Sequence, residues 1–303
     1  MEQEVSFYSD GLKLHGDLYV PEGLAPGERR GAVVLVQGFA TAKSGPMYTM
    51  ARALCDSGYV ALNFDFRGFG ESEGERCRML PLEQVEDTRA AISYLAQQAS
   101  VDPASIGLYG ASFGGGLAVY AAGMDARVRC VVAAVPVGNG ASWMRSLRRA
   151  WEWREFLAIL HEDALNRAMT GETRWVPRGE VLIYEPEVAA RIAEAARSGQ
   201  ANAASARCNE LSLLTAQAVV DFAPELMAVK VTSQPVLFIV AENDPRVPVE
   251  VSRELYDSVP GPKKWVVIPG VGHDAVYNPP VWDVHLSAVR DWLSIHLPAP
   301  SAS

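Results

Sequence analysis

The segment 107–116 reads GLYGASFGGG and places one serine, Ser112, in a Gly-x-Ser-x-Gly frame. A serine hydroxyl is a weak nucleophile, so it attacks a carbonyl carbon only when an oriented base lies within hydrogen-bond reach. The pattern predicts a strand, a very tight turn and a helix from Phe113, the local geometry that such a nucleophile needs. Gly110 and Gly114 stand where a side chain would clash in so sharp a turn. We predict that Ser112 is a nucleophile, the alternative being a chance motif in a loop.

Two later strands end just before an acid and a histidine. The apolar run 236–240 leads to Asp244, and the run 265–268 leads to His273. The carboxyl ends of parallel strands gather at one edge of a sheet, where open α/β folds build their sites. We predict that His273 takes the proton of Ser112, and that Asp244 fixes the histidine tautomer and stabilises the imidazolium. The alternative is that Asp244 only begins a turn and His273 is only a polar loop residue.

Other acids and histidines are weaker candidates for this chemistry. Asp274 adjoins His273, but on a short turn we expect it to point elsewhere. Asp221 precedes the late strand instead of following it. Residues 161–163 are expected to lie on a solvated helix face. None of the remaining candidates is expected to take part in catalysis: His15, His161, Glu162, Asp163, His285 and His296.

Acyl transfer also needs hydrogen-bond donors where negative charge develops on the carbonyl oxygen. One donor is predicted to be the N–H of Phe113, the residue after the nucleophile. The second should come from the loop after the early strand 33–36, which reads QGFATAKSG. Gly38 permits an unusual backbone conformation there, so we predict the Phe39 N–H as the second donor.

The elements that must position these residues alternate along the chain. A hairpin is predicted around Asp10-Gly11, followed by alternating apolar strands and amphipathic helices, which indicates a mostly parallel sheet with helices on both faces. The alternation stops near Gly138 and resumes before 236. We predict one α/β core, formed by residues 1–140 and 221–303, and a cap or lid inserted at 141–220. The cap is expected to be helical throughout, with turns at 170–171 and 176–177.

The predicted cap is rich in tryptophan and arginine. Trp143, Leu147 and Trp151 are spaced by four and are predicted to share one helix face. We expect Trp143 and Trp151 to contribute to an apolar substrate pocket, and the alternative is that they only pack the cap onto the core. Four arginines are expected to be solvated and paired with Glu152 and Glu155, with a substrate carboxylate as the alternative partner: Arg145, Arg148, Arg149 and Arg154.

The amino-acid composition limits the classes of molecule that the protein is expected to bind. The formal net charge of −9 argues against nucleic acid or an anionic membrane as the main partner and leaves a small-molecule substrate. No apolar run approaches the roughly 18 residues of a membrane helix, and no signal peptide is visible. The four cysteines form no C-x-x-C pair, so we expect reduced thiols in a cytoplasmic protein. The five histidines show no metal-ligand spacing, so no metal or cofactor is expected, and a homodimer is compatible with the sequence.

These motifs together resemble the α/β-hydrolase superfamily. The likeness rests on QGF at 37–39, DFRGFGES at 65–72, GASFGG at 110–115, ENDPRVP at 242–248 and GVGH ending at His273. It spans the chain apart from the insertion and looks closest to serine esterases and acyl-peptidases, a branch with feruloyl-esterase-, dienelactone-hydrolase- and cocaine-esterase-like proteins.

The chain departs from these relatives in the oxyanion loop and at the nucleophile, which leaves the predicted triad intact and the substrate class open. Many members carry His-Gly at the oxyanion loop, where this chain has Gln37-Gly38, and cocaine-esterase-like enzymes use a tyrosine hydroxyl that Phe39 lacks. Dienelactone hydrolases use a cysteine where Ser112 stands. We interpret Asp65, Arg67 and their glycines as structural.

The resemblance implies a serine hydrolase that cleaves a carboxylic ester of a small to medium, partly apolar substrate through an acyl-enzyme. A thioesterase, an amide or peptide hydrolase, a lactonase and a carbon–carbon bond hydrolase use the same triad and stay open. A ligand-binding module of the same fold and a dimerising scaffold are the non-catalytic alternatives.

Overall fold

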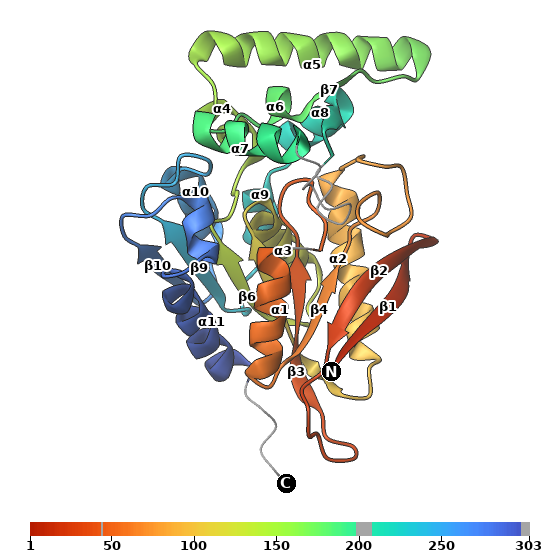
Figure 1. The fold of residues 1–303 in the computed structure, drawn as a ribbon, viewed down its shortest axis with the longest axis vertical. Coiled ribbons are helices and arrows are strands. Elements are labelled where there is room, and N and C mark those ends of the chain that lie inside the picture. The colour runs from red at the N-terminus through yellow and green to blue at the C-terminus, as the bar shows by residue number, and fades with distance from the viewer. Residues whose placement is uncertain (44, 198–207, 298–303) are drawn as a thin grey trace.

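The computed structural model describes residues 1–43, 45–197 and 208–297. An eight-stranded sheet in the order β1-β2-β4-β3-β5-β6-β9-β10 forms its centre (Figure 1). The β1–β2 and β2–β4 pairs are antiparallel and the remaining pairs are parallel, which confirms the predicted fold class. The strands are β1 Glu2–Ser9, β2 Leu12–Tyr19, β3 Arg30–Val36, β4 Val60–Phe64, β5 Val101–Ala111, β6 Val128–Ala134, β9 Val236–Ala241 and β10 Lys263–Ile268.

The hairpin at the start of the chain is confirmed. Asp10 and Gly11 have φ angles of 48° and 81°, and the two strands pair from Ser9 with Leu12 to Glu2 with Tyr19. Positive φ at both turn residues matches the right-handed twist of the flanking strands, and aspartate followed by glycine tolerates it best.

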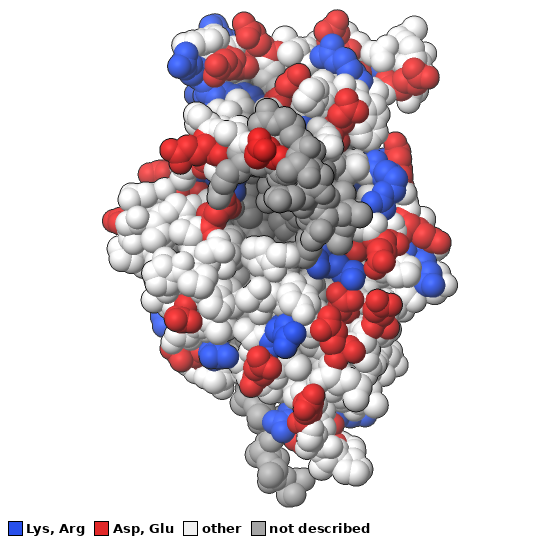
Figure 2. All heavy atoms as spheres, viewed as in Figure 1, with Lys and Arg blue, Asp and Glu red and all other residues white. Residues whose placement is uncertain are grey.

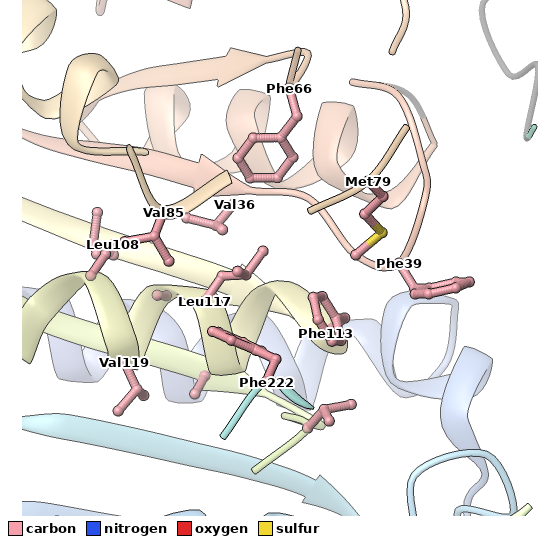
Figure 3. Close-up of a cluster of buried hydrophobic side chains, with 14 of the residues drawn as sticks. Val36, Phe39, Phe66, Met79, Val85, Leu108, Phe113, Leu117, Val119 and Phe222 are labelled. Carbon is pink, nitrogen blue, oxygen red and sulfur yellow. The ribbon is translucent and has the colours of Figure 1, made fainter. Parts of the chain in front are cut away.

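Helices cover both faces of the sheet because alternate strand residues point to opposite sides. Val34 and Val36 pack into one buried cluster with α2, α3 and α10, part of which is drawn in Figure 3. Val33 and Leu35 pack into a second cluster with α1 and α11. The helices are α1 Pro46–Asp56, α2 Pro81–Ala96, α3 Phe113–Met124, α10 Val249–Ser258 and α11 Trp282–His296.

The turn after β4 is structural, as the sequence indicates. The buried carboxylate of Asp65 accepts hydrogen bonds from the N–H groups of Lys43 and Glu71, at 2.6 and 3.1 Å. Burial raises the pKa of this carboxyl group. Arg67 forms an ion pair with buried Asp87 at 2.6 Å. The Lys43 contact ties the turn to the loop after β3, and the ion pair ties it to α2.

Between β6 and β9 the chain leaves the sheet and forms the upper layer of Figure 1, called the insertion below. It is not helical throughout, because β7 and β8 pair as a short antiparallel ribbon and Pro177 lies in a strand instead of a turn. A proline is tolerated there because it sits at the end of a two-stranded ribbon. The insertion comprises α4 Gly140–Ser146, α5 Ala150–Thr170, β7 Trp175–Pro177, α6 Arg178–Val181, α7 Pro186–Arg197, β8 Glu210–Ser212 and α8 Leu213–Asp221, and α9 Pro224–Ala228 follows.

Two expectations about charged side chains of the insertion are wrong. Asp163 of α5 is buried and accepts hydrogen bonds from Thr173 and Arg174, which lie in the segment that follows this helix. Arg148 donates to the carbonyl oxygens of Glu180 and Val181, and its guanidinium lies 3.8 Å from the Phe156 ring centroid. Burial lowers the pKa of Arg148 to about 10. Both side chains bind groups within the insertion and are not part of a solvated face.

The surface that Figure 2 shows carries acidic and basic side chains interspersed with uncharged ones. Across the described ranges, no helix has both the length and the apolar character needed to cross a membrane.

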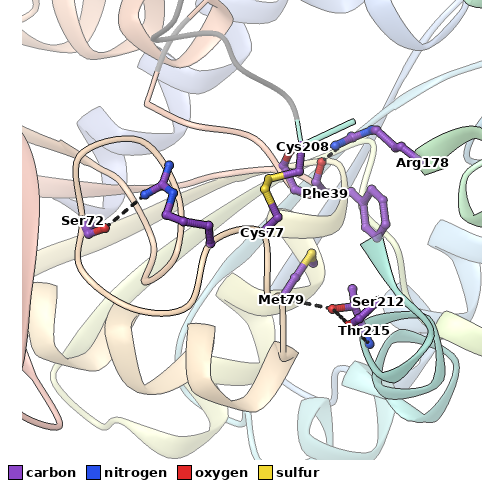
Figure 4. The surroundings of a disulfide bond; sticks show 10 residues. Phe39, Ser72, Cys77, Met79, Arg178, Cys208, Ser212 and Thr215 are labelled. Carbon is purple, nitrogen blue, oxygen red and sulfur yellow. Dashed lines mark hydrogen bonds between the residues drawn. A yellow bond between two sulfur atoms is a disulfide. The ribbon is translucent and has the colours of Figure 1, made fainter. Parts of the chain in front are cut away.

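A disulfide joins Cys77 to Cys208 (Figure 4), so the prediction of four reduced thiols is wrong for these two residues. Cys77 lies in the loop after β4 and Cys208 lies just before β8, so the bond ties the insertion to the core. Cys55 and Cys130 are free thiols. The sequence could not indicate the pair, because 131 residues separate the partners. The expected cytoplasmic location rested on reduced thiols and loses that support.

We predict that denatured, unreduced protein exposes two reactive thiols and that reduced protein exposes four, counted by intact mass after alkylation. Cys77→Ser should lower the free energy of unfolding by about 2–4 kcal/mol, because the bond closes a long loop of the unfolded chain. The matched control Cys55→Ser, at a partly buried free thiol, should lower it by less than Cys77→Ser does. Four reactive thiols in freshly purified, unreduced protein would contradict the cross-link.

Candidate active site

Ser112 occupies the tight turn between β5 and α3. Its φ of 56° and ψ of −123° are unfavourable for a residue with a side chain, so the turn is strained. Backbone hydrogen bonds hold it: the Ser112 N–H donates to Ala134 O at 2.8 Å, and Ser112 O accepts from the N–H groups of Gly115 and Val137. The predicted strand, turn and helix are therefore present around Ser112.

The glycines of the motif are required by close approach of the backbone. A Cβ on Gly110 would lie 2.1 Å from Gly114 O, and a Cβ on Gly114 would lie 2.2 Å from Val36 O. A Cβ on Gly115 would lie 2.7 Å from the Pro136 side chain. Glycine thus lets α3 begin directly against the end of β3.

Asp244 and His273 meet beyond the ends of β9 and β10. His273 is the first residue of the short 3₁₀ helix η2, His273–Tyr277, and its Nδ1 lies 2.7 Å from Asp244 Oδ2. The other carboxylate oxygen, Oδ1, accepts from the N–H groups of Arg246 and Val247. A carboxylate only accepts hydrogen bonds, so Nδ1 carries the hydrogen and Nε2 of the neutral ring remains an acceptor.

Ser112 and His273 line one cavity of about 440 Å³ at the carboxyl ends of the parallel strands. The wall opposite them comes from the insertion, through Trp143, Arg178 and Leu182. The cavity therefore lies between the sheet edge and the insertion, and both candidate reacting groups face it.

The loop after β3 reaches the same cavity. A Cβ on Gly38 would lie 3.4 Å from Ala111 O and 3.7 Å from Ser112 Cβ, which places this loop against the serine turn. Thr41 Oγ1 donates to Gly38 O at 3.3 Å and orients the peptide group that carries the Phe39 N–H. Phe113 is the first residue of α3, so its N–H has no acceptor within the helix.

Trp143 and Trp151 have different surroundings and do not share a helix, because α4 ends at Ser146 and α5 begins at Ala150. Trp143 is buried and lines the cavity, with its Nε1–H donating to Arg246 O at 2.7 Å. Trp151 is half exposed and lies outside the residues that line the cavity.

Trp143 also packs between two elements of the candidate oxyanion hole. Its ring centroid lies 5.5 Å from that of Phe39 and 5.8 Å from that of Phe113. The insertion therefore contacts both residues whose N–H groups are predicted to be donors.

The rival acids and histidines have other partners. Asp274 lines the cavity but forms an ion pair with Arg246, at 2.7 Å. Asp221 accepts hydrogen bonds from Gln217 on the surface of α8. His285 is buried on α11, where its Nδ1–H donates to a backbone carbonyl and its Nε2 accepts from the hydroxyl of Tyr109. Sequence reasoning missed Arg178 and Arg246, because their partners lie far away along the chain.

Burial lowers the pKa of His285 to about 4, from an ordinary value of about 6.5. Below pH 6.5 the unfolded chain therefore takes up a proton that the folded chain does not. We predict that this group removes about 2–3 kcal/mol of stability between pH 7 and pH 4.5. Urea unfolding at both pH values should show a smaller loss for His285→Gln than for the wild type.

The control for that comparison is His161→Gln, at an exposed position on α5, which should follow the wild type at both pH values. Equal losses for His285→Gln and the wild type would contradict the buried neutral histidine.

A family model described as serine aminopeptidase, S33 (Hydrolase_4) matches residues 27–280. Over 296 residues the chain is 29% identical to an uncharacterized 31.7 kDa protein in the traX-finO intergenic region of Escherichia coli, covering 95% of this chain and 97% of that protein. It is 28% identical over 277 residues to a thiohydrolase of Eupenicillium brefeldianum, covering 89% and 87%. The structure of DcsB in complex with its substrate analogue matches with a TM-score of 0.81 at 22% identity, covering 98% and 99%.

Proposed function

Because the chain belongs to the serine aminopeptidase S33 family of α/β-hydrolases, we propose that it cleaves a carboxylic ester through an acyl-enzyme on Ser112. The observation that carries the proposal is the Asp244–His273 hydrogen bond beside a cavity that Ser112 also lines. Along the chain the nucleophile Ser112 comes first, the acid Asp244 second and the base His273 last, which is the order that this fold uses.

In the proposed reaction, Ser112 Oγ attacks the acyl carbon while its proton passes to His273 Nε2. The Phe39 and Phe113 N–H groups stabilise the negative charge on the former carbonyl oxygen. As the bond to the leaving group breaks, His273 returns the proton to the departing oxygen. A water molecule then gives a proton to His273 and attacks the acyl carbon. As the bond between this carbon and Ser112 Oγ breaks, His273 returns the proton to Oγ, which releases the acid and restores the Ser112 hydroxyl. Asp244 stabilises the imidazolium in both steps.

The cavity supports a small to medium, partly apolar substrate. Its volume of about 440 Å³ lies within the range of small-molecule sites. Met47, Trp143 and Leu182 supply apolar walls, and the charged Arg246, which also lines the cavity, is already paired with Asp274. We propose that residues 141–220 act as a cap over a core of residues 1–140 and 221–303.

A thioester is the second candidate substrate, because one relative across most of the chain carries the name thiohydrolase. The same groups serve it without change, since the thiolate is a better leaving group than an alkoxide. Amides, lactones and activated carbon–carbon bonds complete the set of compatible substrates, and a ligand-binding module would bind them without turnover.

The test is a panel with one acyl group, butyrate, as its p-nitrophenyl ester, its N-acetylcysteamine thioester and its anilide. We expect turnover of the ester and of the thioester, with the anilide slowest. Ser112→Ala should lower kcat at least about 10³-fold, because the residual rate depends on binding and the oxyanion hole alone. Asp244→Asn should give a loss of similar size.

The matched control is Ser93→Ala on the exposed surface of α2, which should leave kcat unchanged. Activity that survives in Ser112→Ala would contradict the assigned nucleophile. Tight binding of the panel by the wild type without turnover would favour the ligand-binding module.

A further inference from the structure

We propose that Arg178, a residue of the insertion, is a positioning residue that holds the oxyanion loop of the core in its active conformation. This inference rests on the function proposed above, because it concerns the loop that carries the Phe39 N–H.

The Arg178 side chain reaches from α6 to the loop after β3. Its two terminal nitrogens donate to Phe39 O and Ala40 O, each at 2.8 Å, and the guanidinium lies 5.1 Å from the Phe39 ring centroid. Its Nε–H donates to the Tyr184 hydroxyl at 2.6 Å. The side chain is buried, and Figure 4 shows it directed toward the Phe39 carbonyl. Its planar fork thus binds two successive carbonyl groups of a loop distant in sequence.

These carbonyl groups flank a strained residue. Ala40 has a φ of 46°, in the left-handed region, which costs a residue with a side chain on the order of 1 kcal/mol or more. Hydrogen bonds from a charged donor are stronger than those between neutral groups. Arg178 therefore stabilises a loop conformation that the local sequence does not favour.

The strained turn determines where the oxyanion donor points. The Phe39 N–H lies one peptide group before the carbonyl that Arg178 binds, and Thr41 holds the preceding Gly38 carbonyl. Donors act on the transition state only within a narrow range of distance and angle. Loss of Arg178 should therefore weaken transition-state stabilisation through Phe39, without removing any group that touches the substrate carbonyl.

Arg178 is itself held in place by the insertion. The backbone N–H of Arg178 donates to Asn209 O at 2.8 Å, and Asn209 directly follows the disulfide-bonded Cys208. Arg148 donates to the carbonyl oxygens of Glu180 and Val181 in the same short helix. The cross-link to the core and these hydrogen bonds fix the point from which the Arg178 side chain extends.

A different role for Arg178 predicts a different kinetic pattern. It lines the cavity, so a guanidinium that binds a substrate carboxylate is the competing interpretation. That role would raise KM for an anionic acyl group and spare neutral esters. A positioning role lowers kcat for neutral esters and leaves their KM nearly unchanged.

The experiment compares Arg178→Gln and Arg178→Lys with the wild type on p-nitrophenyl butyrate and on its hemisuccinate analogue. We expect kcat for butyrate to fall about 10–100-fold in Arg178→Gln, with KM changed less than about threefold. Arg178→Lys, which keeps the charge but not the fork, should recover part of the loss. Binding of butylboronic acid, a tetrahedral analogue, should weaken with kcat/KM, while binding of butyrate should not.

Arg167→Gln is the matched control, because Arg167 is an insertion arginine that forms an ion pair with buried Asp163 on α5 and does not line the cavity. It should lower the melting temperature as Arg178→Gln does and leave kcat within about twofold. Equal kcat losses in the two variants would overturn the inference, as would a KM rise confined to the hemisuccinate.

Failure of the proposed function has its own signature. If wild-type protein turns over no ester or thioester, that function fails, and the inference about Arg178 fails with it. If the wild type is active and Arg178→Lys and Arg178→Gln match it in kcat and boronate binding, only the inference fails.

Discussion

The turn after β5 passes so close to the end of β3 that a Cβ on Gly114 would lie 2.2 Å from Val36 O. This approach is possible only without side chains at that point, and it forces Ser112 into a strained conformation at the edge of the sheet. It also brings the first N–H of α3 beside the loop that carries the Phe39 N–H. The nucleophile and both predicted oxyanion donors therefore depend on one backbone contact.

The insertion completes the site that the sheet begins. Trp143 packs on Phe39 and Phe113, and Arg178 binds the carbonyl groups of Phe39 and Ala40. The Cys77–Cys208 bond ties the loop after β4 to the segment just before β8, and Asn209 O of that segment accepts from the backbone N–H of Arg178. The insertion is thus more than a cover over the cavity, because it contacts the backbone that would stabilise negative charge.

Local signals in the sequence predicted the features that depend on neighbouring residues. The Asp10-Gly11 hairpin and the alternation of strands and helices are confirmed, since turn residues and periodicity reflect local preferences. The positions of Ser112, Asp244 and His273 after three strands could also be predicted, because the carboxyl ends of parallel strands lie at one edge of the sheet. Their catalytic roles stay predictions.

The features that the sequence did not predict depend on contacts between distant segments. The helix expected from Trp143 to Trp151 breaks after Ser146, although the spacing of four continues across the break. Asp163 is buried because Thr173 and Arg174 return to it, which no periodicity reveals. Arg178 binds two backbone carbonyl groups of the core, and a backbone acceptor cannot be recognised from residue type.

The most direct test of a catalytic serine at position 112 is covalent labelling by a fluorophosphonate probe, read by intact mass and peptide mapping. An activated serine attacks the phosphorus and displaces fluoride, so we predict one adduct per chain, on Ser112, formed within minutes. The adduct should be absent from Ser112→Ala and from protein unfolded before labelling. A folded wild-type protein that stays unlabelled, or carries its adduct on another residue, would contradict an assembled catalytic serine at this turn.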